Sequence, residues 1–222
     1  MTSLGRGLAV RSRGPVYPQS WSWDPAIREH EYNPQLSEKT LNEAGWSKVG
    51  GAWQKDGKRL DVAILTSVGR WVKDREMVDA TAGYLRQFGI DARGRPMEWA
   101  AFLDAVMKAR DHDMTIWGAG PAQPEPALTA LEENFSSTGK WNPSAFKDPA
   151  FDALLQQAAS TRNRDERKRH YLAAQRIVID RYWSLGMFND VDVVAVRNEA
   201  QGYRFTIPLT RANYTQVTVR GR

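Results

Sequence analysis

The sequence contains no cysteine among its 222 residues, which excludes disulfide bonds, thiolate metal sites and cysteine nucleophiles. Only three histidines occur, His30, His112 and His170, and their spacing matches no histidine motif for zinc or non-haem iron. A Gly-x-Ser-x-Gly elbow and a Gly-x-x-x-x-Gly-Lys loop are both missing, so the common hydrolase and nucleotide-binding signatures fail as well. We therefore expect no metal, no cofactor and no catalytic residue.

The sequence also has no apolar run near the roughly 20 residues that a membrane-spanning helix needs. Its formal net charge of +5 is small for this length. The densest basic cluster, residues 162–170, is interrupted by Asp165 and Glu166 at the start of a predicted helix, which is typical of a solvated helix face. We therefore expect no nucleic-acid partner.

The first 13 residues carry three arginines but no apolar stretch and no small-residue cleavage site, so they do not form a complete secretory signal. Two interpretations stay open. Either the protein remains inside the cell, or an export signal is missing from this chain.

Nine tryptophans and a hydrophobic content of 41% indicate a folded globule. Closely spaced glycines and prolines predict an irregular lead-in over residues 1–32. Asn33 and Pro34 form a cap and first-turn pair. Helices are predicted over residues 34–44 and 73–88, and a further helix begins near residue 99. Two more begin after Asp148-Pro149 and after Asn163, which forms a capping-box pair with Glu166. Acidic residues at predicted helix starts are interpreted as charge favoured by the helix dipole: Asp74, Glu76, Glu98 and Glu166.

Strand signals alternate with these helices. Asp56 and Gly57 predict a hairpin turn, and the apolar run within residues 60–66 suits a strand that is covered on both faces. Weaker strands are expected over residues 90–95 and 114–117, and β-rich segments over residues 184–197 and 203–219. The order βαβαβ, followed by helices and returning strands, predicts an α/β domain with a mixed, mainly parallel sheet flanked by helices.

Three successive loops are rich in tryptophan and hydrogen-bonding groups, and we interpret all three as strand-end loops. In an open α/β sheet, ligands bind at the carboxyl ends of the strands. A single tryptophan is better explained by core packing, whereas three in successive loops favour a pocket built from indole faces and a few polar groups. The predicted ligand-binding residues are Arg70, Trp71, Trp117, Gly118, Gln123, Trp141 and Asn142.

An ordered series of short motifs resembles the family 5 extracellular solute-binding proteins, the peptide, nickel and oligosaccharide receptors of ABC importers. The series runs from about residue 14 to about residue 205. It comprises Tyr32-Asn-Pro34, Asn42-Glu-Ala-Gly-Trp46, Leu65-Thr-Ser-Val-Gly-Arg70 with Lys73-Asp74, Met97-Glu-Trp99, Asp113-Met114, Trp141-Asn142, Asp148-Pro149, Asp152-Ala-Leu-Leu155, Arg167, Tyr171, Ala174-Gln175, Val194-Ala-Val-Arg197 and Gly202-Tyr203.

The resemblance implies a periplasmic-binding-protein-like (type II) lobe and a specific mechanism. In the family, two α/β lobes close over a solute, and a membrane permease recognises the closed form without any bond being made or broken. The match covers only the family's C-terminal portion, so we expect a fragment that lacks the N-terminal first lobe. The expected organisation is a lead-in or hinge over residues 1–32, a solute-binding lobe over 33–203 and a tail over 204–222 that returns toward the missing lobe. A periplasmic or extracellular, membrane-associated location is implied as well.

One departure from the family pattern concerns the ligand. Many peptide binders of the family carry an aspartate, in the loop matching residues 117–125, that pairs with the free amine of the peptide. Ala122 and Gln123 are the nearest counterparts here. Because a buried ammonium without its carboxylate is costly, the resemblance implies a neutral or differently charged solute, such as a sugar stacked on Trp117 or a blocked peptide. Glu125 is an alternative partner from a shifted loop.

Two other classes of function stay open at this point. The chain is alternatively a self-standing enzyme or regulatory domain that has reused the lobe, for which turnover sensitive to a carboxylate near Trp117 is the discriminating observation. It is alternatively an interaction module that joins a separately encoded first lobe, for which an upstream reading frame encoding that lobe is the discriminating observation.

Overall fold

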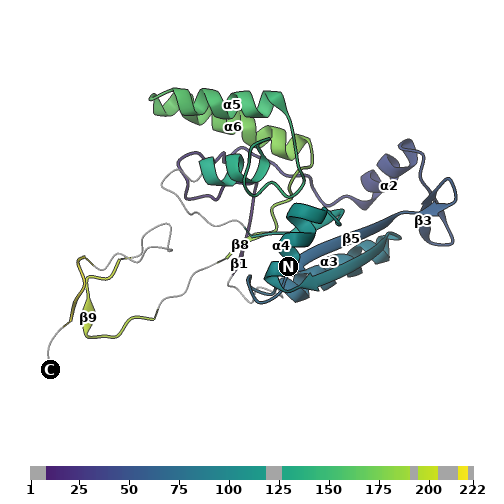
Figure 1. The fold of residues 1–222 in the computed structure, drawn as a ribbon, viewed down its shortest axis with the longest axis horizontal. Coiled ribbons are helices and arrows are strands. Elements are labelled where there is room, and N and C mark those ends of the chain that lie inside the picture. The colour runs from purple at the N-terminus through teal and green to yellow at the C-terminus, as the bar shows by residue number, and fades with distance from the viewer. Residues whose placement is uncertain (1–8, 119–126, 191–194, 205–214, 220–222) are drawn as a thin grey trace. The chain divides into compact units, whose positions relative to one another are not determined.

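The computed structural model describes residues 9–118, 127–190, 195–204 and 215–219 (Figure 1). The chain divides into two compact units. Unit 2 is His30–Gly118, and unit 1 combines Met1–Glu29 with Ala119–Arg222. Each unit has two small sheets and its own buried hydrophobic residues. None of the helices in the described residues combines the length and apolar character that crossing a membrane requires.

The centre of unit 2 is a three-stranded parallel sheet with the order β6-β5-β7. Strand β5 (Asp61–Ser67) pairs in parallel with β6 (Asp91–Met97) on one side and with β7 (Met114–Ile116) on the other. The predicted strands and their parallel arrangement are confirmed. Helix α3 (Asp74–Phe88) connects β5 to β6 and ends at Gly89, whose φ of 101° few other residues adopt.

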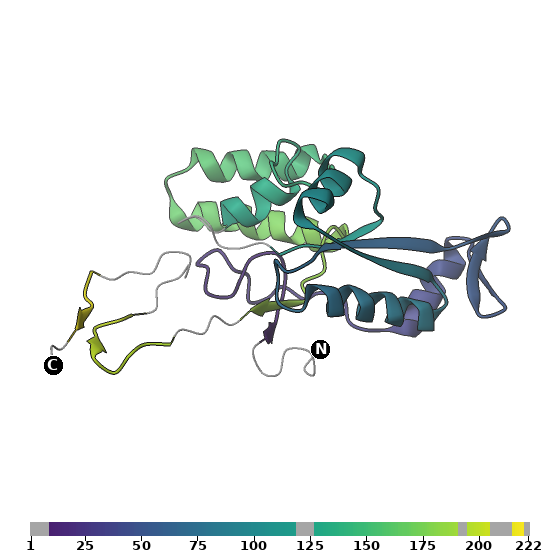
Figure 2. The same cartoon turned by 60° about the horizontal axis from the view of Figure 1, so that its bottom comes forward.

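Both faces of this sheet are covered, as the apolar run of β5 predicts. Because side chains alternate along a strand, Ile64 packs on one face with Val78 of α3, and Leu65 packs on the other with Phe102. Phe102 belongs to helix α4 (Trp99–Leu103), which continues into a π-helix, η1 (Asp104–Ala109). Figure 2 shows the sheet and its helices from a second direction.

The remainder of unit 2 is helix α2 (Pro34–Glu43) and a small antiparallel sheet, β2 (Ser47–Val49), β3 (Ala52–Lys55) and β4 (Lys58–Arg59). Asn33 caps α2 as predicted, by accepting a hydrogen bond from the Leu36 N–H. The predicted turn at Asp56 and Gly57 is confirmed, with φ values of 53° and 73°. The buried Trp53 ties this sheet to the end of α3, because its Nε1–H donates to the Phe88 carbonyl at 3.0 Å.

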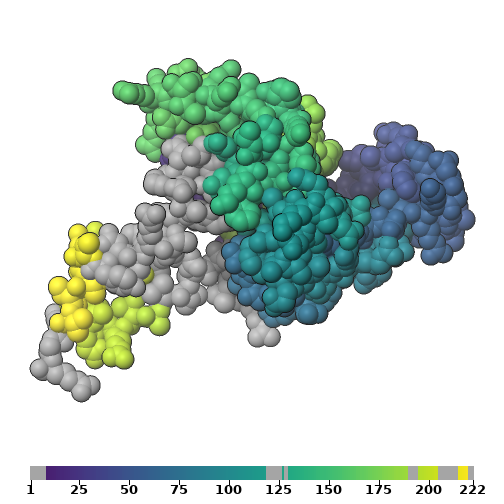
Figure 3. All heavy atoms as spheres, in the orientation of Figure 1, coloured from purple at the N-terminus to yellow at the C-terminus, as the bar shows by residue number. Residues whose placement is uncertain are grey.

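Unit 1 contains a π-helix, η2 (Leu128–Glu133), and two long helices, α5 (Pro149–Ser160) and α6 (Arg164–Asp180). Helices α5 and α6 lie side by side in both cartoon views, and their side chains, in green, form one layer in Figure 3. Asp148 and Asn163 cap them as predicted. The predicted reciprocal capping box is not formed, because the Glu166 carboxylate accepts from the Thr161 hydroxyl, which in turn accepts from the Asn163 N–H.

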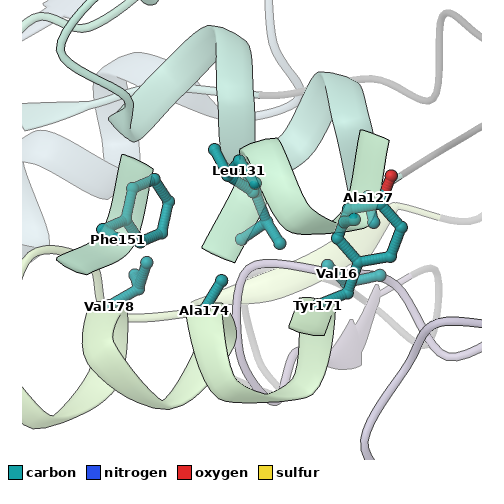
Figure 4. Packing of buried hydrophobic residues seen from close by; sticks show 9 residues of the cluster. Val16, Ala127, Leu131, Phe151, Tyr171, Ala174 and Val178 are labelled. Atoms are coloured by element: carbon teal, nitrogen blue, oxygen red, sulfur yellow. The ribbon is translucent and has the colours of Figure 1, made fainter. Parts of the chain in front are cut away.

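The core of unit 1 joins distant parts of the chain (Figure 4). Phe151 of α5 faces Val178 of α6 at one end, and Tyr171 lies beside Val16 and Ala127 at the other, with Leu131 between them. Residues 9–29 are largely irregular, as expected, but they are packed against α6. In addition, β1 (Ala9–Arg11), which the sequence analysis misses, pairs antiparallel with β8 (Phe188–Asp190).

The C-terminal part contains less strand than predicted. Within the described residues from 184 onward, strand is confined to β8, β9 (Ala200–Gln201) and β10 (Thr218–Val219). Strands β9 and β10 pair antiparallel. The predicted β-rich runs also include residues 191–194 and 205–214, which lie outside the described residues.

Candidate functional site

The carboxyl ends of the three parallel strands of unit 2 lie at one edge of the sheet. Arg70 and Trp71 are in the loop after β5, Trp99 begins α4 directly after β6, and Trp117 and Gly118 follow β7. We call these five residues the aromatic edge. Two hydrogen bonds hold the strand ends in register: the Val68 N–H donates to the Met97 carbonyl at 2.8 Å, and the Thr66 hydroxyl donates to the Ile116 carbonyl at 3.2 Å.

The aromatic edge is organised around the guanidinium of Arg70. Its Cζ atom lies 3.9 Å from the ring centroid of Trp99 and 5.3 Å from that of Trp71. Trp117 lies next to Trp99, with 5.9 Å between ring centroids, and 5.5 Å from the fully buried Phe102. The cluster therefore continues from the core of the sheet into an exposed cation, and cation–π contacts of this kind contribute about 0.5–1 kcal/mol at exposed sites.

Gly118 is required by this packing. A Cβ atom built on Gly118 would lie 2.6 Å from ring carbons of Trp71, which is too short for any real contact. The indole of Trp71 therefore packs directly on the backbone at the end of β7. This contact joins the loop after β5 to the loop after β7.

The loop that carries Arg70 and Trp71 is held by the carboxylate of Asp74. Asp74 is only 5% exposed, and its Oδ2 atom accepts from the N–H groups of Arg70 at 3.0 Å and Trp71 at 3.3 Å. Its Oδ1 atom accepts from the Arg75 N–H at 2.8 Å. The interpretation of Asp74 as a charge at a helix start is confirmed, since it is the first residue of α3. Its second role is to fix the loop conformation.

Arg70 is exposed and forms no ion pair with any described residue. The guanidinium carbon of Arg70 lies over the Trp99 ring, and the N–H donors of a guanidinium point outward in its own plane. The aromatic edge can therefore offer flat apolar surface and several charged hydrogen-bond donors to the same ligand.

Trp141 and Asn142 belong to unit 1. The prediction that their loop follows a strand is wrong, because residues 139–142 come after a helical segment that includes η2. Asn142 is 6% exposed and uses its amide within the loop: its Nδ2 atom donates to the carbonyls of Ser136 and Phe146, both at 2.9 Å, and its Oδ1 atom accepts from the Phe146 N–H. The ammonium of Lys140 lies 5.1 Å from the Trp141 ring. Gln123 lies outside the described residues.

The pKa values of Tyr17, Glu76 and His112 are shifted, and none of these residues belongs to the aromatic edge. Burial lowers the pKa of His112, and the nearby Arg110 lowers it further. Backbone hydrogen bonding at the start of α3 and a contact with Lys73 lower the pKa of the exposed Glu76. Burial raises the pKa of Tyr17. Within the described residues no group of three or more histidine or acidic side chains is arranged to hold a metal ion.

The family model for bacterial extracellular solute-binding proteins, family 5 (middle), matches residues 1–142, which is more than half of the chain. The chain belongs to the family 5 solute-binding proteins. The resemblance predicted from the ordered motifs is thereby confirmed.

Curated relatives of this family 5 chain are binding proteins by name. Heme-binding protein A of Haemophilus influenzae is 24% identical over 203 residues, which cover 89% of this chain and 35% of the relative. Di/tripeptide-binding protein 2 of Pseudomonas aeruginosa is 24% identical over 206 residues, which cover 92% of this chain and 37% of the relative. The family 5 chain thus spans little more than a third of the length of these relatives.

Solved structures confirm the fold class of the family 5 chain. The dipeptide-binding protein of Pseudoalteromonas sp. SM9913, in complex with Met-Leu, has a TM-score of 0.77 at 24% identity and matches 99% of this chain and 42% of its own. NikA of Brucella suis, in complex with Fe(III)-EDTA, has a TM-score of 0.76 at 17% identity and matches 99% of this chain and 44% of its own. The predicted α/β, periplasmic-binding-protein-like lobe is therefore confirmed.

The family 5 chain brings four of its seven predicted site residues together: Arg70, Trp71, Trp117 and Gly118. A fifth member of the cluster, Trp99, was not among the predicted site residues, because its position indicates the start of a helix. Trp99 does pack on Phe102 in the core, with 5.7 Å between ring centroids, yet it also supports Arg70. Trp99 could have been predicted as a site residue. It follows a predicted strand, and in an open α/β sheet ligands bind at the carboxyl ends of strands, which is the reason that Trp71 and Trp117 were predicted.

Proposed function

We propose that the chain is the substrate-binding part of an ABC transporter, which captures a small polar or peptide-like solute and delivers it to membrane permease subunits. The observation that carries this proposal is the aromatic edge, where an exposed arginine and three tryptophans meet at the carboxyl ends of three parallel strands. Such edges bind ligands in open α/β folds. Family membership supports the same conclusion.

The proposed mechanism is population shift. The solute binds the aromatic edge on one side and a second lobe on the other, so it stabilises the closed form that the permease recognises. The relatives extend well beyond the matched residues, which supports a first lobe as the second wall of the site. No bond is made or broken in this cycle. The names of the relatives, which describe binding rather than catalysis, support a protein that is not an enzyme.

The proposed ligand has flat surface and an anionic or carbonyl group. Indole faces bury such surface at little entropic cost, and the guanidinium of Arg70 donates charged hydrogen bonds to carboxylates or carbonyls. A peptide held by a free amine in the loop after β7 remains disfavoured by the sequence at Ala122 and Gln123. Trp141, Asn142 and Gln123 remain proposed ligand contacts, and the present geometry supports Asn142 mainly as the residue that shapes its loop.

The proposed location is the periplasm or the outer face of a membrane. Relatives in Escherichia coli include a probable D,D-dipeptide-binding periplasmic protein, DdpA, and a probable ABC transporter periplasmic-binding protein, SapA. Secretion of the full-length gene product, followed by fractionation, tests this part of the proposal directly. Recovery of the full-length product only in the cytoplasm would contradict it.

Calorimetry with a defined solute panel tests the binding function. The panel contains Met-Leu, its N-acetylated form, heme, Ni(L-His) and a disaccharide, which samples the ligands named for relatives together with blocked and sugar ligands. We expect the 222-residue chain to bind its solute weakly, with a Kd of roughly millimolar size, because association without a second wall buries little of the ligand. Submicromolar binding would contradict the two-lobe proposal.

Substitution of Arg70 tests the site. Arg70→Gln should weaken binding by about 10-fold or more, because a hydrogen bond to a charged group contributes roughly 1.5–3 kcal/mol. Arg75→Gln is the matched control, since Arg75 is also exposed and lies in α3 of the same unit. Equal affinities of the Arg70→Gln variant and the unchanged chain would show that the ligand binds somewhere other than the aromatic edge.

A further inference from the structure

Two buried hydrogen-bond donors at the aromatic edge have no partner among the described residues. Ser67, the last residue of β5, is 0% exposed, and its hydroxyl makes no hydrogen bond. The indole Nε1–H of Trp71 is buried and unpaired in the same way. Buried donors are almost always satisfied in folded proteins, because leaving them unpaired costs stability. Two such donors in one loop region therefore need an explanation.

Strand geometry places Ser67 on the face of β5 that packs against α4. Side chains alternate along a strand, so Ser67 shares a face with Ala63 and Leu65. Leu65 belongs to the cluster that also contains Trp99 and Trp117. Ser67 therefore lies on the same face of the sheet as these two tryptophans, at its carboxyl end.

Trp71 reaches the same edge from the loop. Its ring packs on Gly118 at the end of β7 and lies beside the guanidinium of Arg70. Both unpaired donors therefore lie at the carboxyl end of β5, one on the last residue of the strand and the other in the loop that follows it.

Two acceptors near the aromatic edge already have donors. The carboxylate of Asp74 accepts from three backbone N–H groups, and the carbonyl of Ile116 accepts from the Thr66 hydroxyl. Three groups here can donate a further hydrogen bond: the Ser67 hydroxyl, which can also accept one, the Trp71 indole and the Arg70 guanidinium. Such an edge suits a ligand group that accepts hydrogen bonds.

We propose that the Ser67 hydroxyl and the Trp71 indole N–H donate to carbonyl or carboxylate oxygens of the bound solute and thereby determine its specificity. This inference rests on the proposed solute-binding function and deepens it. It selects an acceptor-rich group, such as a peptide bond or a carboxylate.

Nuclear magnetic resonance of the indole N–H groups tests the proposal on the complete chain. The nine tryptophans give separate indole signals, and Trp71→Phe identifies the signal of Trp71. The probes are N-methylacetamide for a carbonyl, acetate for a carboxylate and methyl glucoside for a sugar hydroxyl. We expect N-methylacetamide and acetate to shift the Trp71 indole proton downfield in a saturable manner, and methyl glucoside to do so less.

Trp23 supplies an internal control. Its Nε1–H is also buried and unpaired, but it lies in unit 1, so its signal should stay unchanged in the same spectra. Ser67→Ala should weaken N-methylacetamide binding at Trp71 by about 2- to 10-fold, the range for loss of one neutral hydrogen bond. Ser47→Ala, an exposed serine of the same unit, should leave the binding unchanged.

The outcomes separate this inference from the proposed function. Equal shifts of Trp71 and Trp23, or no saturable Trp71 shift with any probe, would overturn the donor proposal. Solute binding that depends on Arg70 but not on Ser67 would overturn it as well, while leaving the solute-binding function intact. If the calorimetric panel fails although Trp71 responds to N-methylacetamide, the edge binds an acceptor group, but the proposed solute-binding function is contradicted and with it the role of the two donors in solute specificity.

Discussion

The guanidinium carbon of Arg70 lies over the indole of Trp99, 3.9 Å from the ring centroid, although the two residues follow different strands. This contact joins the loop after β5 to the start of α4, and it supports an exposed cation on an aromatic surface that is itself anchored in the core. The positions of both residues therefore depend on the parallel pairing of β5 with β6.

A double-mutant cycle measures this contact. Arg70→Met and Trp99→Leu, singly and together, should show a coupling free energy of about 0.5–1 kcal/mol in urea unfolding, the range for exposed cation–π pairs. Arg75→Met paired with Trp99→Leu is the control and should be additive. Additive effects for the first pair would mean that the stacking contributes nothing to stability.

Replacing either of two glycines of unit 2 by alanine should change the stability of the chain, in opposite directions at the two positions. Gly118→Ala should destabilise the chain by about 1–3 kcal/mol, because the new methyl group overlaps the Trp71 ring. Gly83→Ala should stabilise it by about 0.5–1 kcal/mol, because Gly83 lies inside α3 with open space around it. Urea unfolding measures both effects. If Gly118→Ala leaves the free energy of unfolding unchanged, the Trp71 ring can move aside without cost.

Loss of the Asp74 carboxylate should loosen the loop that carries Arg70 and Trp71. Asp74→Ala leaves three backbone N–H groups without their acceptor and should cost about 1–3 kcal/mol. Limited proteolysis should then cleave near residue 70, whereas the exposed Asp79→Ala variant of the same helix should resist. Identical digestion of both variants would refute the proposed role of Asp74.

The end of α6 should be stabilised by a substitution to glycine. Tyr182 has a φ of 55° and is 74% exposed. Its N–H donates to the Ile179 carbonyl, and the Trp183 N–H donates to the Val178 carbonyl, as in helix ends that normally carry glycine at this position. Tyr182→Gly should raise the unfolding free energy by about 1 kcal/mol. A decrease would show that contacts of the tyrosine side chain outweigh the backbone strain.

Stability should decrease at mildly acidic pH because of His112. Its pKa in the folded chain is lowered by burial and by Arg110, so the unfolded chain takes up the proton first. The neutral imidazole is fully compatible with folding above the unfolded pKa of about 6.5, and the free energy of unfolding falls as the pH drops from there to the folded pKa. His112→Gln should reduce this fall in chemical denaturation from pH 7 to pH 5. An unchanged pH dependence would contradict the assignment.

Local signals in the sequence predicted the elements that depend on neighbouring residues. The caps at Asn33, Asp148 and Asn163 are each formed within three residues, and the apolar run of β5 encodes burial on both faces. The strand-end rule then brought Arg70, Trp71 and Trp117 together. Trp99 also follows a strand, but its helical position suggested core packing on Phe102 and gave no indication of its contact with Arg70.

Other features could not be read from the sequence because they depend on distant partners. Strands β2 and β4 are short and fully exposed, so they carry no apolar pattern, and their pairing depends on the central strand with Trp53. Similarly, nothing local shows that residues 139–142 follow a helix, since the six residues of η2 are too few to display a clear period. The burial of Val16 against α6 likewise follows from tertiary packing.

The burial of Val16 has a consequence for biosynthesis. Unit 1 is built from both ends of the chain, with unit 2 inserted between them, and the Gln175 amide of α6 donates to the Ser22 carbonyl across 153 positions of sequence. On the ribosome, unit 2 has all its residues before α6 is made, so it can fold first. The residues around Ser22 cannot form their contacts with α6 until the ribosome has released α6. Contacts of such high sequence separation form slowly, and the exposed early segment is the part of the nascent chain most in need of protection from aggregation.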